Sequence, residues 1–314
     1  MSTDAPAWDR EGRDWPNRAT SRFVTAGGLR WHVQVAGPRD GEGAPDLLLL
    51  HGTGAATHSW AGLLPLLARH ARIIAPDLPG HGFTSMPRGG EGLSLPGMAR
   101  AVGALLAALD SRPVLAAGHS AGAAILLRMA IERQVAPRTV IGLNAALLPW
   151  DGVAGQLFSP LARLLVGIPV VPWLLSWRAA DRAVVERLLR GTGSRLDPAQ
   201  TEFYVRLFRQ PRHVAAALGM MAAWDLHALA RTLPRLATPL LLVAGAGDRT
   251  IAPEQSRRVQ QMLPPGLVRR TVLPGLGHLA HEERPELVAP LILRELATPN
   301  DTAPPAAGAE GCAA

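Results

Sequence analysis

Short apolar segments alternate with helix-like segments along most of this chain, and this alternation limits the folds that it can adopt. Leu47–Leu50 and Val114–Ala117 are continuous apolar runs, and each leads into a segment of helical character. A strand buried on both faces is apolar throughout, and strands joined through helices run parallel. The pattern predicts an α/β domain with a mostly parallel sheet and helices on both faces.

The alternation also predicts how the chain is divided. It stops at about Leu147 and resumes with residue 236, so we expect a sheet domain in two segments, 21–146 and 236–297. Residues 147–235 hold apolar, helix-like segments without a convincing strand, which predicts an inserted helical lid. Residues 1–20 are expected to form a flexible, tryptophan-containing arm, and residues 298–314 a disordered tail.

Composition and charge narrow the function classes. The chain has 314 residues and a net charge of +7, and all its basic residues other than histidine are arginines. They are interleaved with acidic residues rather than gathered in a patch, so nucleic-acid binding is not expected. The single cysteine, Cys312, cannot form an intramolecular disulfide, and residues 1–22 lack the apolar run of a secretory signal. We therefore expect a cytoplasmic protein, with a charge that also suits peripheral contact with an anionic membrane.

Residues Gly118–Gly122, with the sequence GHSAG, match the G-x-S-x-G pattern of a nucleophile elbow. In that motif a serine lies on a sharp strand-to-helix turn that exposes its hydroxyl, and the small flanking residues let neighbouring chain segments approach. An apolar strand is expected before this pentapeptide and an apolar helix after it. Ser120 is therefore the candidate nucleophile, although a glycine-rich turn without chemistry would show the same five residues.

A serine hydroxyl needs a positioned base to attack a carbonyl at neutral pH. Asp248 ends the stretch LLLVAGAGD and His278 ends TVLPGLGH, so each is expected just beyond a strand, where open α/β sheets place their sites. We predict that His278 is the base and that Asp248 orients it. Either residue alone is explained by a helix cap or a loop position, but the order Ser, Asp, His favours a triad.

The stretch HGTG, residues 51–54, has two interpretations, because both dinucleotide-binding folds and acyl-transfer enzymes place such a turn after a strand. The dinucleotide fingerprint expects a third glycine where this chain has Thr57, although Asp77 is acceptably spaced for a ribose contact. We therefore favour an oxyanion hole, formed by the backbone N–H groups of Thr53 and Ala121.

The predicted lid carries large apolar side chains that would suit a flat hydrophobic ligand. The candidate substrate-binding residues are Trp150, Trp173, Trp177, Met220, Met221 and Trp224. The same residues could instead pack the lid against the core, and a lid that rests on a membrane surface is a third interpretation. No metal is predicted, because His278 and His281 lack a third ligand at zinc spacing, and the proposed chemistry needs no cofactor.

The motifs HGTG, DLPGHGFT, GHSAG, GAGD and GLGH resemble, in this order, the landmarks of the α/β-hydrolase superfamily over most of the chain. Longer stretches, among them HGTGAATHSW, MMAAWDL and GLGHLAHEE, resemble the BchO family of magnesium-chelatase accessory proteins in bacteriochlorophyll biosynthesis. The resemblance implies a role in photosynthetic bacteria near the insertion of magnesium into a porphyrin, with a porphyrin intermediate as ligand and magnesium-chelatase subunits as partners.

Three functions stay open at this point. The first is ester hydrolysis by acyl transfer on a large apolar substrate that resembles a tetrapyrrole or a lipid. The second is a non-catalytic accessory protein that binds a tetrapyrrole and leaves its triad unused. The third is a cofactor-free oxygenase or perhydrolase on the same fold.

Overall fold

The computed structural model describes residues 8–38, 43–149, 168 and 170–298. Within them the sheet has eight strands: β1 (Ser21–Ala26), β2 (Leu29–Ala36), β3 (Asp46–Leu50), β4 (Arg72–Pro76), β5 (Leu115–His119), β6 (Thr139–Leu143), β7 (Leu240–Gly245) and β8 (Val268–Leu273). Their spatial order is β1-β2-β4-β3-β5-β6-β7-β8. The strand β2 is antiparallel to β1 and β4, whereas all pairs from β4 to β8 are parallel. The mostly parallel sheet predicted from the sequence is confirmed.

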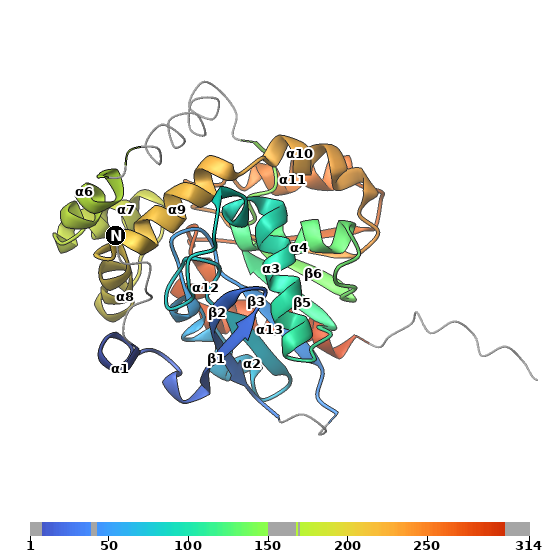
Figure 1. Ribbon diagram of the computed structural model, residues 1–314. Helices are drawn as coiled ribbons and strands as arrows, with labels where there is room; N and C mark the ends of the chain where they lie inside the picture. The colour runs from blue at the N-terminus through green and yellow to red at the C-terminus, as the bar shows by residue number, and fades with distance from the viewer. Residues whose placement is uncertain (1–7, 39–42, 150–167, 169, 299–314) are drawn as a thin grey trace, which may run out of the picture.

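Helices cover both faces of this sheet (Figure 1). Those connected with the sheet are α2 (Leu63–Leu67), α3 (Leu95–Ala108), α4 (Ala121–Ile131), α11 (Glu254–Met262), α12 (Ala280–Glu283) and α13 (Pro285–Ala297). On β3, Leu48 and Leu50 pack in a core with residues of α3 and α4, while Leu47 and Leu49 pack in a second core with residues of α2 and α13. This two-sided burial is why the strand is apolar at every position.

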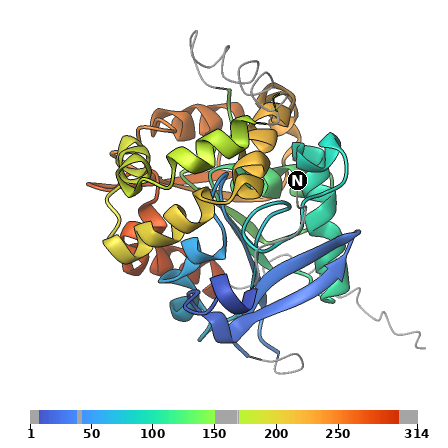
Figure 2. The same ribbon diagram turned by 60° about the vertical axis from the view of Figure 1, so that its left-hand side comes forward.

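Between β6 and β7 the described chain forms α6 (Val171–Arg178), α7 (Arg182–Gly191), α8 (Pro198–Phe208), α9 (Pro211–Ala223) and α10 (Leu226–Thr232). Figures 1 and 2 show α6 to α9, coloured yellow-green to orange, gathered on one side of the molecule. No described residue from 170 to 235 belongs to a strand. Among the described helices none is long and apolar enough to cross a bilayer.

Residues 8–20 differ from the flexible arm that composition predicts. The helix α1 (Trp8–Glu11) and the residues after it pack on the core, and Trp15 is only 3% exposed. Trp15 donates from Nε1 to Thr57 Oγ1 at 2.9 Å, and both Trp8 and Trp15 pack edge-on against Phe83. Trp8 and Trp15 pack an otherwise polar segment against the core. Its average composition therefore does not predict that it is packed. Residues 299–314 of the predicted tail lie outside the described residues.

Candidate active site

Ser120 lies at the turn between β5 and α4, with φ 50° and ψ −114°. This left-handed conformation is strained for a residue with a side chain. The flanking glycines explain how the turn is accommodated: a Cβ on Gly122 would lie 2.1 Å from Leu50 O, and one on Gly118 would lie 2.5 Å from Ala123 N. Both positions therefore require glycine, as the nucleophile-elbow interpretation expects.

The structure places Asp248 and His278 in contact. His278 Nδ1 lies 2.8 Å from Asp248 Oδ2, and both residues are buried. The other carboxylate oxygen, Oδ1, accepts from the backbone N–H groups of Thr250 and Ile251 at 2.8 and 2.9 Å. With Nδ1–H donating to the carboxylate, the neutral ring keeps Nε2 as an acceptor for a proton.

Asn144 belongs to the same cluster and was missed in the sequence. It follows β6 with a positive φ of 46°, and its Nδ2 donates to Asp248 Oδ2 at 2.8 Å and to Gly277 O at 3.2 Å. The signal that identified Asp248, a polar residue just beyond a buried strand, was available for Asn144 too. Asp248 thus accepts four hydrogen bonds, which fixes its carboxylate as a rigid support for His278.

The elbow and His278 are joined through His119, another residue that sequence reasoning missed. The His119 ring centroid lies 4.7 Å from that of His278, and His119 Nε2 donates to the His278 carbonyl at 3.0 Å. Burial holds the pKa of His119 well below its usual value, so the ring stays neutral. Within the described chain no hydrogen bond joins the side chains of Ser120 and His278. Hydrogen bonds between a nucleophile and its base are often long before substrate binds. The positions of Ser120, His278 and Asp248 are therefore compatible with a catalytic triad, although the bond between Ser120 and His278 is not formed.

The predicted oxyanion turn lies beside the elbow, because a Cβ on Gly52 would be 3.1 Å from Ser120 Cβ. The turn is closed by a hydrogen bond from Ala55 N to Gly52 O at 3.2 Å, and Gly54 takes a φ of 75°. Neither the N–H of Thr53 nor that of Ala121 donates a hydrogen bond to another described residue. Two uncommitted donors next to a serine suit stabilisation of a developing negative charge.

His51 holds this turn in place. Its Nδ1 donates to Gly52 O at 2.8 Å, while its Nε2 accepts from Leu78 N at 2.8 Å. Burial lowers the pKa of His51, in keeping with a neutral ring that donates on one side and accepts on the other. Its role here is structural.

Helices α8 and α9 border the turn from the other side. His213 Nε2 donates to Gly54 O at 3.0 Å, and Thr53 Oγ1 lies 3.4 Å from Met220 Sδ, to which it donates. A Cβ on Gly54 would lie 3.3 Å from the ring of Phe208. The residues between β6 and β7 therefore contact the candidate site directly.

The predicted substrate-binding residues have different positions. Met220 is buried at the turn, Met221 is half-buried, and Trp224 is half-buried and packs against the main core. Trp173 and Trp177 on α6 are 51% and 65% exposed. The buried residues of α6 are Pro172 and Ser176, one turn apart, so the tryptophans point elsewhere. Trp150 lies outside the described residues.

A second buried polar cluster lies close to the site. Glu282 Oε1 accepts from Ser59 Oγ and from Tyr204 Oη, the latter at 2.6 Å, and Ser59 Oγ lies 2.9 Å from His281 Nε2. Burial raises the pKa of Glu282 to about 7 and lowers that of His281 to about 3. His281 is thus engaged in a protein hydrogen bond, and the described residues contain no group of three or more potential ligands that could hold a metal.

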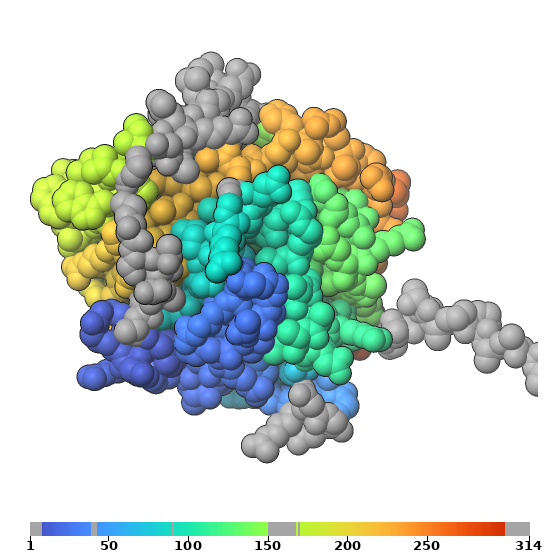
Figure 3. All heavy atoms as spheres, in the orientation of Figure 1, coloured from blue at the N-terminus to red at the C-terminus, as the bar shows by residue number. Residues whose placement is uncertain are grey.

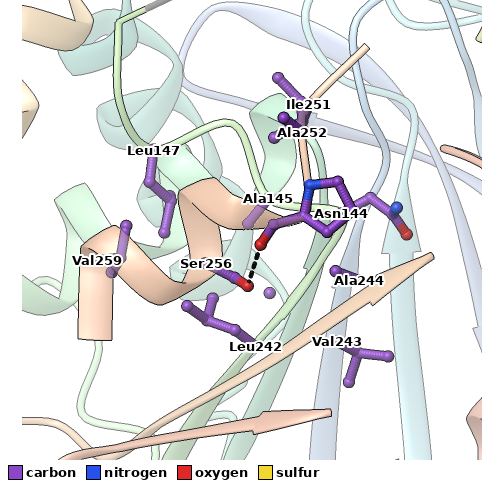
Figure 4. Close-up of a pocket in the computed structure, with 12 residues that line it drawn as sticks. Asn144, Ala145, Leu147, Leu242, Val243, Ala244, Ile251, Ala252, Ser256 and Val259 are labelled. Carbon is purple, nitrogen blue, oxygen red and sulfur yellow. Dashed lines mark hydrogen bonds between the residues drawn. The ribbon is translucent and has the colours of Figure 1, made fainter. Parts of the chain in front are cut away.

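A cavity of about 10 Å³ lies next to Asn144 (Figure 4). Its walls are mostly apolar and include Leu147, Leu242, Ile251 and Val259. The amide of Asn144 points away from these side chains in Figure 4. The space is about that of one water, so it is not a substrate pocket.

Comparison with known proteins supports the fold described above. The family described as the alpha/beta hydrolase fold matches residues 45–285. The chain is 41% identical over 281 residues to the magnesium-chelatase 30 kDa subunit of Rhodobacter capsulatus, covering 89% of this chain and 95% of that protein. It is 28% identical over 257 residues to a 2-hydroxy-6-oxo-2,4-heptadienoate hydrolase of Pseudomonas putida, covering 79% of this chain and 87% of that protein.

Solved structures show the same fold. The enol-lactonase of Burkholderia xenovorans LB400 has a TM-score of 0.71 at 20% identity, covering 88% of this chain and 100% of the other. A putative lipase of Acinetobacter baumannii has a TM-score of 0.70 at 21% identity, covering 91% of this chain and 95% of the other. These identities support the architecture alone.

Proposed function

Because the chain belongs to the α/β hydrolase fold family, we propose that it is a serine hydrolase that cleaves an ester by acyl transfer. The observation that supports this most is the 2.8 Å contact between His278 and Asp248, next to a serine in a strained strand-to-helix turn. A buried carboxylate that orients an imidazole near a serine is the arrangement that this chemistry needs.

In the proposed reaction, Ser120 Oγ attacks the ester carbonyl carbon while its proton passes to His278 Nε2. The carbonyl oxygen becomes negative and is met by the N–H groups of Thr53 and Ala121. The C–O bond to the leaving alcohol then breaks as His278 returns the proton to that oxygen. Water, deprotonated by His278, attacks the acyl-enzyme in the same way and releases the acid and Ser120.

We also propose a cytoplasmic role beside magnesium chelation. The similarity to a protein named as a magnesium-chelatase subunit supports chelatase subunits as partners. A porphyrin intermediate, or an ester carried by one, is the proposed ligand. The apolar residues that border the oxyanion turn, Met220 and Phe208, suit such a large hydrophobic molecule.

The hydrolase proposal is tested by replacing Ser120. We expect Ser120→Ala to lower kcat for a small activated ester such as p-nitrophenyl butyrate by about a thousandfold or more. Full activity in this variant, with circular dichroism showing a folded protein, would contradict the proposal.

A matched control is present in the chain. Ser21 Oγ lies 3.0 Å from His32 Nε2, and His32 Nδ1 lies 2.8 Å from Asp77 Oδ2, so these three residues form a second serine–histidine–aspartate set. Ser21 belongs to the edge strand β1, His32 to β2, and His32 and Asp77 are fully buried. Ser21→Ala is expected to leave kcat unchanged, which separates the loss of a particular nucleophile from the loss of any hydrogen-bonded serine.

The second candidate function is non-catalytic binding of the tetrapyrrole. One observation favours it: among the described residues no hydrogen bond joins the side chains of Ser120 and His278. This function predicts that Ser120→Ala retains pigment synthesis in the producing cell, whereas the hydrolase proposal predicts its loss.

A further inference from the structure

Exposed apolar side chains are concentrated in one part of this molecule. Among the described residues, eleven large hydrophobic side chains are exposed, and seven of them lie between residues 168 and 188. Single exposed hydrophobic residues are ordinary on protein surfaces, whereas a cluster indicates a surface that binds something. We call the described residues from 168 to 190 the α6–α7 corner.

Two features of the α6–α7 corner restrict what it can bind. Its most exposed apolar residues are Trp177 (65%), Leu188 (57%) and Trp173 (51%), and it forms the left-hand edge of the molecule in Figures 1 and 3. The helix α6 is only eight residues long and has exposed side chains around most of its circumference. A protruding, tryptophan-rich corner suits shallow insertion into a soft apolar medium.

The charges around these residues are predominantly positive. Residues 168–190 contain four arginines against two acidic residues. Both acids are engaged: Glu186 pairs with Arg182 and Arg190, and Asp181 caps α7 by accepting from Ala183 N at 2.9 Å. Arg178 and Arg187 are exposed and pair with no acidic group among the described residues. Exposed apolar side chains surrounded by basic residues are typical of surfaces that bind anionic lipid headgroups.

We propose that the α6–α7 corner docks on an anionic lipid bilayer, with Trp173, Trp177 and Leu188 entering the interface and Arg178 and Arg187 at the headgroups. The proposal does not depend on chemistry at Ser120. It does place the candidate site close to the membrane, because α6 packs against α9, and α9 supplies Met220 and His213 to the oxyanion turn. An apolar substrate dissolved in the bilayer would then reach the site by a short path.

The test is flotation of the full-length protein with vesicles of phosphatidylcholine alone or with 30% phosphatidylglycerol, at low and high salt. We expect binding to the anionic vesicles that weakens as salt rises. Replacing both tryptophans, Trp173→Ala with Trp177→Ala, is expected to reduce binding at least tenfold. Replacing Arg178 and Arg187 by Gln is expected to reduce it about fivefold for each arginine.

Matched controls come from exposed residues elsewhere. Leu287 on α13 is 42% exposed, against 43% for Leu174 on α6, so Leu174→Ala should weaken binding and Leu287→Ala should not. Arg112→Gln is the corresponding control for charge. Absence of binding to every vesicle, or equal loss in Leu287→Ala, would overturn the proposal. Light scattering that shows a dimer lost in the double tryptophan variant would also overturn it, because the corner would then bind a second copy.

Discussion

Asn144 and His278 donate to the same oxygen of Asp248, both at 2.8 Å. A hydrogen bond to a charged group contributes about 1.5–3 kcal/mol, so loss of the Asn144 contact should loosen the support of the imidazole. The choice of replacement matters because Asn144 has a positive φ of 46°, which glycine adopts without strain.

We therefore predict that Asn144→Gly lowers kcat for ester hydrolysis about ten- to a hundredfold, with KM nearly unchanged. The matched control is Arg133→Gly, since Arg133 also has a positive φ, of 58°, at the end of α4. Steady-state kinetics of the two variants check the prediction. Equal activities in both would show that the Asn144 side chain does not support the site.

Glu282 is a second residue whose effect can be measured, through the pH dependence of the unfolding free energy. Its carboxyl is buried among Ser59 and Tyr204, and burial raises its pKa from 4.5 to about 7. Between these values the folded protein keeps a proton that the unfolded chain releases. The contribution of Glu282 to stability is therefore complete at about pH 4.5 and below and is lost as the pH rises through about 7.

Glu282→Gln removes this titration while it keeps an acceptor oxygen for Tyr204. We predict that its unfolding free energy relative to wild type increases between pH 5 and pH 8, by on the order of 3 kcal/mol. Urea unfolding at the two pH values measures the change. The exposed Glu286→Gln is the control and should show no such increase, whereas parallel pH profiles for Glu282→Gln and wild type would refute the assignment.

At the scale of elements, the contact between α9 and the loop after β4 attaches the inserted helices to the sheet domain. Arg212 donates to three carbonyls of that loop: Gly80 at 3.0 Å, Gly82 at 2.6 Å and Thr84 at 2.7 Å. Burial lowers the pKa of Arg212 to about 10, which leaves it charged at neutral pH. One side chain thus satisfies three backbone acceptors that have no other donor among the described residues.

Arg212→Met is predicted to destabilise the protein by about 2–4 kcal/mol, because the carbonyls lose their donors while the side-chain volume is largely kept. Proteolysis within residues 168–235 should also accelerate. Arg209→Met, which loses one exposed bond to Ala180 O, serves as the control and should change stability by less than about 0.5 kcal/mol. Thermal unfolding and limited trypsin digestion of both variants provide the measurement.

Many of the helices and strands could be predicted from the sequence. Each strand and the helices after β5, β7 and β8 were predictable, because apolar runs such as Leu47–Leu50 and the helical periodicity are local signals. The positions of Asp248 and His278 followed from a general property of parallel sheets, that strand ends meet at one edge.

Other contacts were not predictable because their partners are distant in the chain. The bond between Ser59 and Glu282 spans 223 residues, and that between Trp15 and Thr57 spans 42. Trp15 was assigned to a flexible arm because its neighbours are polar, and for Trp173 and Trp177 the sequence left ligand binding, core packing and membrane contact open. The burial of a side chain depends on which face of its segment packs against the core. A single sequence reveals that face only where its apolar residues recur periodically.

For the whole molecule, the buried histidines determine how stability depends on pH. Burial lowers the pKa of six of them: His51, His58, His81, His119, His213 and His281. Below about pH 6.5 these histidines bind protons in the unfolded chain but stay neutral in the folded protein. Each histidine therefore stabilises the fold fully above that pH and progressively less as the pH falls towards its lowered pKa.

We predict that the unfolding free energy declines from pH 7 to pH 5 by on the order of 1 kcal/mol per pH unit for each of His58, His213 and His281, whose pKa values fall to about 3, 4 and 3. Together they outweigh the opposite contribution of Glu282. His58→Phe should reduce this slope, because neither nitrogen of His58 has a hydrogen-bond partner within the described part of the chain and its ring packs edge-on against Tyr204. The exposed His70→Phe should not. A free energy that is constant over this range would show that these histidines titrate freely.

The central claim is that Ser120, and no other serine, is an activated nucleophile. The measurement that tests it most directly is reaction with a fluorophosphonate, followed by intact mass and peptide mapping of the adduct. The account predicts one adduct, on Ser120, that is lost in Ser120→Ala and strongly slowed in His278→Ala. An unreactive wild-type protein, or an adduct on Ser21 that persists in Ser120→Ala, would contradict it.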